Sequence, residues 1–364
     1  MSADRPEHHA GGRTPCAFVV PGALETRTGG YIYDRSLIDA LRKAGRRVAH
    51  LPTPAGFPQP TPADEAETLR LLHAQPAQTP LILDGLVYGA IDTAGLARVR
   101  PPMIAMLHHP LGLEAGLPPD RARALIEREA ANLRLAAHVV VPSPHTARIL
   151  TADFGVAPED ISIALPGFPR PEVRSLPKDA PPLILSVGLI CARKGHDVLL
   201  DALARIADLD WRCEIVGLTQ DRAVADALRA QCARLGLTGR VRFAGCLSDA
   251  DLQALYARAT LFALATRYEG YGMVFGEALL NGLPIVTCAV GAVPETVPAA
   301  AGLLAPPDDP PAFADALRRL LTDPAEHAAR AAAARRAGAA LPVWADTAAV
   351  MGAAVDRVAA RQRV

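Results

Sequence analysis

Two glutamates on either side of a glycine-rich turn are the residues of this chain whose types and spacing most clearly suggest chemistry. Glu269 and Glu277 lie eight positions apart in the run Arg267-Tyr-Glu-Gly-Tyr-Gly-Met-Val-Phe-Gly-Glu277. Carboxylates accept hydrogen bonds from neighbouring hydroxyl groups, so one can bind a ribose diol and the other the hydroxyls of a sugar. This arrangement suits a bound sugar nucleotide. The structural alternative is that Glu269 complements a helix dipole and that Glu277 lies on a solvated helix face.

The elements that must position these glutamates are a buried strand and a helix. Thr260-Leu-Phe-Ala-Leu264 is an apolar run typical of a buried strand, and Met273 to Leu280 predicts a helix. The helix N-terminus offers free N–H groups and the positive end of its dipole, which favour an anion such as phosphate. Gly270 and Gly272 have no Cβ, so the backbone of the turn can approach a phosphate closely.

The whole chain repeats one pattern of strands and helices twice. The first series of apolar strands is 17–20, 47–51, 80–83, 103–107 and 138–141, and the second is 183–187, 211–216, 241–243, 260–264, 284–287 and 302–304. Strands that alternate with helices predict parallel doubly wound sheets, whose ligands bind beyond the carboxyl ends of the strands. Six prolines between Pro166 and Pro182 exclude regular structure and predict a linker. We therefore expect a disordered tail (1–15), an N-terminal domain (16–168), a linker (169–182) and a C-terminal domain (183–344).

Four segments, in order along the chain, resemble one known family. Besides the glutamate pair they are Ser186–Leu203, in which Lys194 precedes Gly195, then Val241–Leu252, and the closing runs 291–295 and 302–308. Together they resemble the retaining glycosyltransferases of family 4, whose signature is two glutamates with seven residues between them. The resemblance implies the GT-B fold, an α/β architecture of two Rossmann-like doubly wound parallel-sheet domains that face each other across a cleft. It also implies that the last helix (345–364) crosses back to the first domain after a break at 341–344.

The resemblance further implies an activity and a set of site residues. The activity is transfer of a sugar from a nucleoside-diphosphate sugar to an acceptor, with retention of anomeric configuration and without an enzyme nucleophile or a metal ion. The residues implied as catalytic are Glu269, Lys194 and His108, and those implied as donor-binding are Gly30, Arg193, Gly270, Tyr271, Gly272, Met273, Glu277 and Cys246. No D-x-D-like metal site accompanies them, and we interpret the Asp308-Asp309 pair as solvated.

One position departs from the family pattern. Leu189 stands where the family usually has an arginine that stabilises the leaving diphosphate. Arg193, beside Lys194, either takes over this role or points away to solvent. Lys194 itself could be a solvated loop lysine, but the flanking match favours phosphate binding.

The first domain contributes less specific signals. In His108-His109-Pro110, at a strand end, we favour His108 as the residue that contacts the donor sugar, although a strand-end histidine can equally be a packing residue. Gly29-Gly30-Tyr31 precedes a helix, as in the family, but is also a common loop. Ser143 and Thr146 are typical of a helix N-cap and first turn.

Composition excludes several classes of protein. The 38 Lys and Arg balance the 38 Asp and Glu, which argues against a nucleic-acid partner. The six cysteines form no C-x-x-C pair and indicate reduced core residues of a cytoplasmic protein. Residues 1–15 lack the features of a signal peptide, and the longest uncharged stretch, Ala278 to Pro294, is interrupted by glycine and proline, which argues against a membrane span.

Two other function classes remain open at this level. A nucleotide-sugar hydrolase or epimerase can share the fold, and Leu189 leaves room for a catalytically silent nucleotide-binding protein. The acceptor, whether a saccharide, a lipid carrier or a small molecule, cannot be read from the sequence. The predicted helix Asp34–Arg47 has a basic end, which either answers the helix dipole or contacts a membrane peripherally.

Overall fold

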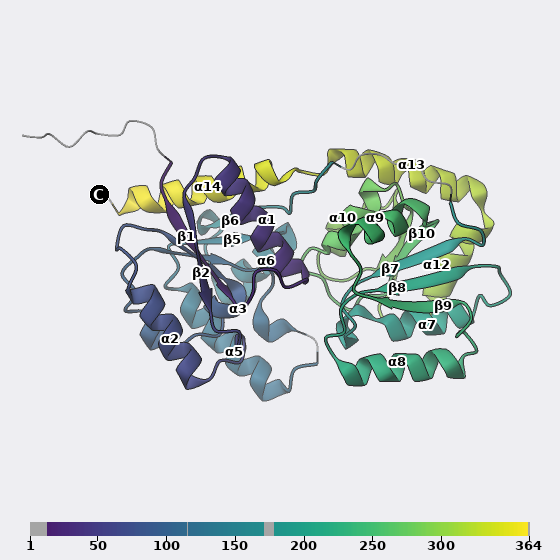
Figure 1. The fold of residues 1–364 in the computed structure, drawn as a ribbon, viewed down its shortest axis with the longest axis horizontal. Coiled ribbons are helices and arrows are strands. Elements are labelled where there is room, and N and C mark those ends of the chain that lie inside the picture. Colours follow the sequence, from purple (N-terminus) through teal and green to yellow (C-terminus); the bar gives the residue numbers. More distant parts are fainter. Residues whose placement is uncertain (1–12, 115, 171–177, 363–364) are drawn as a thin grey trace, which may run out of the picture.

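The computed structural model describes residues 13–114, 116–170 and 178–362, which form two α/β domains side by side (Figure 1). Each domain contains a six-stranded sheet in which every pair of neighbouring strands is parallel. The two-domain α/β fold predicted from the strand and helix pattern is therefore confirmed. Most of the predicted tail (residues 1–12) and half of the predicted linker (residues 171–177) lie outside the described residues.

The first domain has the strand order β2-β1-β3-β4-β5-β6. Its strands are β1 (Cys16–Pro21), β2 (Val48–Thr53), β3 (Leu81–Asp84), β4 (Met103–Met106), β5 (His138–Val141) and β6 (Ile161–Ile163). Its helices are α1 (Gly29–Lys43), α2 (Pro62–His73), α3 (Gly85–Tyr88), α4 (Thr93–Leu96), α5 (Pro119–Leu133) and α6 (Pro144–Phe154), with 3-10 turns at Leu111–Leu113 and Pro158–Asp160.

Side chains that alternate along each strand bury both faces of this sheet under helices. Val19 of β1 packs in one cluster with Leu72 of α2, whereas Phe18 packs on the opposite face with Leu37 of α1 and Val355 of the C-terminal helix. A strand buried on both faces is apolar at successive positions, which is why these strands appear in the sequence as continuous apolar runs.

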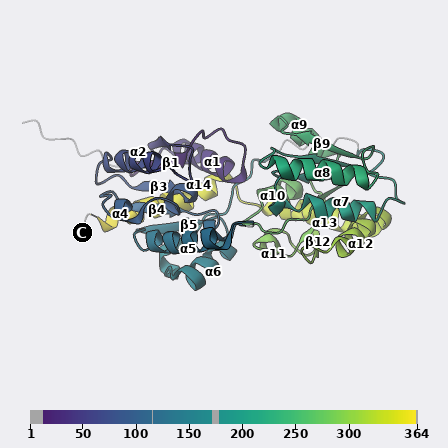
Figure 2. The ribbon, with the colours of Figure 1, turned by 90° about the horizontal axis from the view of Figure 1, so that it is seen from below.

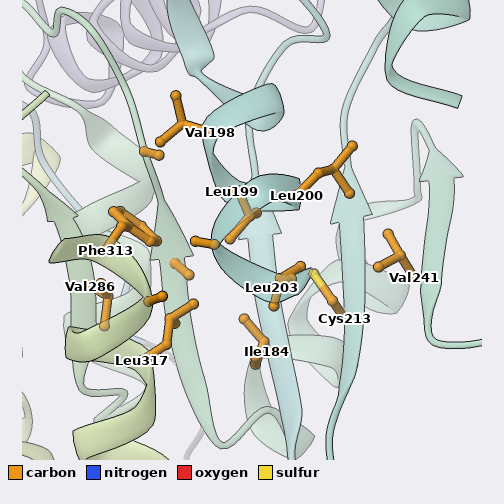
Figure 3. Close-up of a cluster of buried hydrophobic side chains, with 14 of the residues drawn as sticks. Ile184, Val198, Leu199, Leu200, Leu203, Cys213, Val241, Val286, Phe313 and Leu317 are labelled. Atoms are coloured by element: carbon orange, nitrogen blue, oxygen red, sulfur yellow. The ribbon is translucent and has the colours of Figure 1, made fainter. Parts of the chain in front are cut away.

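The second domain has the strand order β12-β11-β10-β7-β8-β9. Its strands are β7 (Leu183–Val187), β8 (Arg212–Val216), β9 (Val241–Gly245), β10 (Leu261–Leu264), β11 (Ile285–Cys288) and β12 (Gly302–Ala305). Its helices are α7 (His196–Ala204), α8 (Arg222–Arg234), α9 (Asp249–Arg258), α10 (Met273–Leu280), α11 (Val293–Thr296), α12 (Pro310–Thr322) and α13 (Pro324–Ala340), and a 3-10 turn spans Ala192–Lys194. Figure 3 shows Leu199 of α7 and Phe313 and Leu317 of α12 packed over the strands on one face.

Each sheet has a point at which the strand order reverses. In the first sheet, β1 lies between β2 and β3, and in the second, β7 lies between β8 and β10. Such a switch point opens the space beyond the strand ends, because the connections on its two sides leave in opposite directions. The loops after β1 and β3, and those after β7 and β10, are therefore the segments in which ligand-binding residues are expected.

The C-terminal helices connect the two domains. α13 covers the second domain, and α14 (Trp344–Arg361) extends across the first, where it packs against α1, β5 and β6 (Figures 1 and 2). Arg46 ties this helix down, since its guanidinium pairs with Asp356 at 2.9 Å and donates to the Gly352 carbonyl. No single described helix is long and apolar enough to cross a bilayer. α13 and α14 reach that length and composition only as a pair bent by 43°.

Several details differ from the sequence-based expectations. The short strand β6 was not predicted, because Ile161–Ile163 is only partly buried and carries a polar residue at its centre. The predicted helix Asp34–Arg47 already ends at Lys43, since Gly45 adopts a left-handed φ of 83° that terminates it. Arg46 is consequently a buried structural residue and does not belong to a basic helix face.

The cysteine prediction also needs one correction. All six cysteines are free, and four of them, Cys16, Cys213, Cys232 and Cys288, are buried as expected. Cys191 is only half-buried, however, and Cys246 is exposed, so these two are not core residues.

Candidate active site

The loop after β7 places Lys194 inside the second domain. The Lys194 residue is 8% exposed, and its aliphatic stem packs on Gly188, where a Cβ would lie 3.3 Å from the Lys194 Cδ. Gly195, with a φ of 62°, follows directly, and a Cβ at that position would overlap the Ala265 carbonyl. The two glycines thus allow the lysine to turn inward below the end of β10.

Glu269 is the anionic partner of this lysine. Lys194 Nζ lies 2.5 Å from Glu269 Oε1, and the Thr266 hydroxyl donates to the same oxygen at 2.9 Å. Arg193 Nη1 lies 3.7 Å from the other carboxylate oxygen. Burial alone would raise the pKa of Glu269, but Lys194 and then Arg193 outweigh it and hold this pKa below its ordinary value. Glu269 is therefore an ionised carboxylate with two cations beside it.

Arg193 links the two domains. Its Nε donates to Glu114 of the first domain at 2.7 Å, and its Nη1 donates to the Tyr268 carbonyl at 3.1 Å. Its side chain is 16% exposed, so the alternative that it points away to solvent is wrong. Glu114 also lies 2.8 Å from His109 Nε2. Burial would raise the pKa of Glu114, but these two partners lower it to about 2.

The backbones of the two domains approach each other at Gly270. A Cβ on Gly270 would overlap the carbonyl oxygen of His108, so only glycine allows this contact. The His108 ring in turn lies over Gly30, where a Cβ would be 3.2 Å from the ring. Three of the residues implied by the family resemblance, His108, Gly30 and Gly270, are thus brought together at this interdomain junction.

The His108 ring also meets two buried carboxyl groups of its own domain. Its Nε2 lies 3.1 Å from Asp34 Oδ1 of α1 and 3.7 Å from Asp84 Oδ2 at the end of β3. Burial and then the neighbouring Asp34 raise the pKa of Asp84 to about 8. The three nitrogen and oxygen atoms lie within 4.8 Å of one another. We name Asp34, Asp84 and His108 the first-domain cluster.

Glu277 occupies a different environment from Glu269. It lies in α10, and the Tyr256 hydroxyl of α9 donates to its Oε2 at 2.8 Å. Burial raises the pKa of Glu277 to about 7, and no cation among the described residues lies within ion-pair distance of it. Glu277 is half-buried and bound by Tyr256, so it does not lie on a fully solvated helix face. Of the two glutamates, only Glu269 is held ionised by neighbouring cations.

The remaining predicted residues lie around these groups. Gly272, with a φ of 84°, caps α10 and approaches the Glu269 side chain, because its Cβ would lie 3.5 Å from the Glu269 Cγ. Met273 packs against the core of the first domain. The Tyr271 carbonyl accepts a hydrogen bond from Thr296. Cys246 is exposed beyond β9 and has no described contact with the other site residues.

Two smaller predictions have clear outcomes. Ser143 is the N-cap of α6, and its hydroxyl accepts a hydrogen bond from Thr146 N at 3.1 Å, which confirms the structural role expected of this pair. Asp308 and Asp309 are not simply solvated, since Asp308 pairs with Arg267 at 2.7 Å and Asp309 caps α12.

Sequence reasoning missed five polar residues of the site. They are Asp34, Asp84, Glu114, Tyr256 and Thr266. Asp84 directly follows a predicted strand, and Thr266 follows another by two positions, so strand-end position was the signal that could have identified both. Asp34 and Tyr256 lie within helices, where nothing in their spacing distinguishes them from surface residues.

Known proteins resemble this chain in sequence and in fold. Residues 181–323 match the family model described as glycosyl transferases group 1. This match covers most of the second domain. Over 255 residues the chain is also 32% identical to D-inositol 3-phosphate glycosyltransferase 1 of Catenulispora acidiphila, in an alignment that covers 63% of this chain and 61% of the relative. The chain thus matches less than two thirds of the length of that curated relative.

Solved structures show the fold of the whole chain. The sucrose-phosphate synthase of Thermosynechococcus elongatus superposes with a TM-score of 0.81 at 22% identity, over 96% of this chain and 100% of the other. HepE of Anabaena, in complex with UDP and glucose, gives a TM-score of 0.72 at 19% identity over 93% and 98%. The described residues therefore have the two-domain GT-B fold, as the sequence predicts.

Proposed function

We propose that this chain transfers a sugar from a nucleoside-diphosphate sugar to a hydroxyl group of an acceptor, with retention of anomeric configuration. One observation carries the proposal: Arg193, Lys194 and an ionised Glu269 converge beside the glycine cap of α10. The group 1 family match and the similarity to D-inositol 3-phosphate glycosyltransferase 1 support it, because both names state glycosyl transfer.

Each of these groups has a place in the chemistry. Cleavage of the bond between sugar and diphosphate builds positive charge on the sugar and negative charge on the leaving phosphate. Arg193, Lys194 and the free N–H groups of α10 would stabilise the phosphate, and Glu269 would bind hydroxyls of the sugar. The leaving phosphate accepts the proton of the acceptor hydroxyl, so this scheme needs neither an enzyme nucleophile nor a metal ion.

Donor binding requires one exchange of partners. Arg193 Nε is engaged by Glu114 at 2.7 Å, and a diphosphate that binds this guanidinium would have to displace that carboxylate. A diphosphate carries more negative charge than a carboxylate and offers several acceptor oxygens, which favours the exchange. Since Glu114 belongs to the first domain, the exchange would loosen one contact between the domains as the donor enters.

The test is a donor screen followed by product analysis. UDP-, GDP- and ADP-sugars are added to the full chain, and the donor that raises the melting temperature is incubated with and without saccharide, inositol phosphate and lipid-linked acceptors. We expect a glycosylated product whose anomeric configuration, measured by proton NMR, equals that of the donor. Release of free sugar at the same rate without acceptor would indicate a hydrolase. Binding without turnover would indicate a silent nucleotide-binding protein, and an inverted product would contradict retention.

A further inference from the structure

The first-domain cluster, Asp34, Asp84 and His108, lies at the switch point of the first sheet. Asp34 comes from the second turn of α1, Asp84 ends β3, and His108 follows β4. The carboxyl groups of Asp34 and Asp84 are nearly inaccessible to solvent, at 1% and 3% exposure of the residues. His108 is the member that reaches the interdomain junction, where its ring lies over Gly30 and its carbonyl touches Gly270.

Two buried carboxyl groups this close together cannot both hold a negative charge without a cation nearby. Asp84 can remain a neutral acid, because burial and then the neighbouring Asp34 raise its pKa to about 8. Burial by itself would lower the pKa of His108, but Asp34, followed by Asp84, raises it above the ordinary value. The two carboxyl groups therefore favour the protonated form of the His108 ring, and burial favours retention of the proton on Asp84.

The other groups packed around the cluster do not compete for this role. The Tyr33 ring meets the His108 ring edge-on at 5.0 Å, and its hydroxyl donates to the Ala164 carbonyl. The Tyr31 hydroxyl donates to the Pro21 carbonyl, and burial raises its pKa to about 12. The Leu86 N–H donates to Asp84 Oδ1. These groups are neutral near pH 7, so the two carboxyl groups determine the charge of His108.

The geometry also determines which ring nitrogen remains available. Nε2 is directed at Asp34 and, more distantly, at Asp84. Nδ1 has no hydrogen-bond partner among the described residues, and it is not among the atoms sequestered from solvent. A neutral ring with its proton on Nε2 would present a lone pair at Nδ1, whereas an imidazolium presents an N–H donor there.

We propose that Asp34 and Asp84 are positioning residues that hold His108 as an imidazolium over Gly30, so that its Nδ1–H donates to an oxygen of the bound sugar nucleotide. The inference rests on the proposed function, because it takes the ligand at the junction to be that donor. We take that oxygen to be one of the leaving diphosphate, which becomes more negative as its bond to the sugar breaks. A cationic donor at this point therefore stabilises the transition state more than a neutral ring does.

The first test is an NMR titration of the His108 ring in the full chain without substrate. The Cε1–H signal is assigned by its loss in His108→Gln, and we expect it to titrate above pH 6.5. Asp34→Asn, which keeps the shape of the side chain, should lower that midpoint by about one pH unit or more. Asp84→Asn should lower it as well, and Asp39→Asn, an exposed carboxylate on the same helix, should leave it unchanged.

The second test is kinetic and follows the same variants. The alkaline fall of kcat/KM for the donor should occur near the NMR midpoint and move to lower pH in Asp34→Asn, whereas a merely structural role would lower the rate at every pH. The NMR titration needs no substrate. It therefore determines the charge state of His108 even if the proposed function is wrong.

Three results would overturn the inference. The first is a wild-type His108 titration midpoint at or below pH 6.5, and the second is an unchanged midpoint in a folded Asp34→Asn variant. The third is one equivalent of a bound divalent ion whose removal by a chelator shifts the His108 signal. The last would mean that the cluster holds a cation instead of a proton.

Discussion

The ammonium of Lys194 lies 2.5 Å from the carboxylate of Glu269, and the two side chains are only 9% and 6% exposed. They come from the loops after β7 and β10, which are neighbours in the sheet although the residues are 75 positions apart. Two residues to which the sequence assigned separate ligands, a diphosphate and a sugar, are therefore each other's nearest partners. A substitution of either one changes a buried charge as well as a ligand contact.

Breaking this pair should cost stability. Lys194→Met leaves Glu269 with Arg193 as its remaining cation, and we expect a loss of about 3 kcal/mol in the free energy of unfolding. The double variant Lys194→Met/Glu269→Gln should recover most of the loss, because no unpaired charge is left. Urea unfolding measures both, with Lys43→Met, an exposed lysine, as the control. Equal losses in the single and double variants would show that packing, and not charge, is responsible.

Arg193 and Lys194 should act as one unit on the leaving diphosphate. Arg193→Ala should reduce transfer by roughly one to three orders of magnitude, and Lys194→Ala at least as much, as expected for the loss of an electrostatic stabiliser. The double variant should lose less than the sum of the two free energies, since both cations serve the same group. The measurement is kcat/KM for the donor. A silent Arg193→Ala beside a severe Lys194→Ala would assign the phosphate to Lys194 and α10 alone.

The two glutamates should separate in kinetics. Glu277→Ala is expected to weaken nucleotide binding, whereas Glu269→Ala should mainly lower turnover, because only the second interacts with the reacting sugar. The pKa of Glu277 is raised to about 7, so its acceptor oxygens are lost as pH falls through that value. Nucleotide affinity, measured by calorimetry from pH 8 to pH 6, should therefore decrease in the wild type and stay nearly constant in Glu277→Ala. Unchanged affinity and rate in both variants would refute the assignment.

Much of the fold could be predicted because these strands are buried on both faces. Apolar runs revealed eleven of the twelve strands now observed, and the bounds of α10 agree with those predicted. The edge strand β6 escaped because Ser162 interrupts a segment of only three residues. Helix ends were harder to place where a glycine, such as Gly45, ends a helix inside a basic stretch.

The site was predictable only where its residues form a compact motif. Glu269 and Glu277 could be identified by their spacing, and Lys194 could be identified by the glycine that follows it. The pairing of Lys194 with Glu269 could not be predicted, because it depends on β7 lying next to β10, a relationship set by the sheet and not by the order of the strands. Asp34 and Asp84 could not be predicted for the same reason, since each is an isolated aspartate in the sequence and only α1 and β3 bring them to His108.

Glu114 should act as a competitor of the donor. In Glu114→Gln the carboxylate that engages Arg193 becomes a neutral amide, so a diphosphate no longer displaces an ion pair. We expect KM for the donor to fall several-fold with kcat changed less. Glu127→Gln, an exposed glutamate of α5, is the matched control. A rise in KM would mean instead that Glu114 positions Arg193 for binding and does not compete with the ligand.

Glu129 should make the stability of the first domain depend on pH. Its residue is fully buried in α5, its Oε2 accepts from Leu111 N at 3.0 Å, and its Oε1 has no partner among the described residues. Burial raises the pKa of Glu129 from 4.5 to about 8. Between these values the folded protein keeps a proton that the unfolded chain has released. The contribution of Glu129 to the free energy of unfolding is therefore full below pH 4.5 and is lost as pH rises from 4.5 through 8.

The loss attributable to this one carboxyl group is about 3 kcal/mol between pH 6 and pH 9. Glu129→Gln keeps an acceptor for the Leu111 N–H and has no proton to lose, so its unfolding free energy should fall by that much less over the same range. Asp84 and Glu277 also have raised pKa values and contribute to both proteins equally, which is why the difference between wild type and variant is the quantity to measure. Parallel curves for the two proteins would show that Glu129 is already ionised in the fold. Leu111 directly follows His108-His109-Pro110, so loss of stability around Glu129 at high pH should also loosen this loop. Amide hydrogen exchange at Leu111 should therefore accelerate at high pH in the wild type but not in the variant.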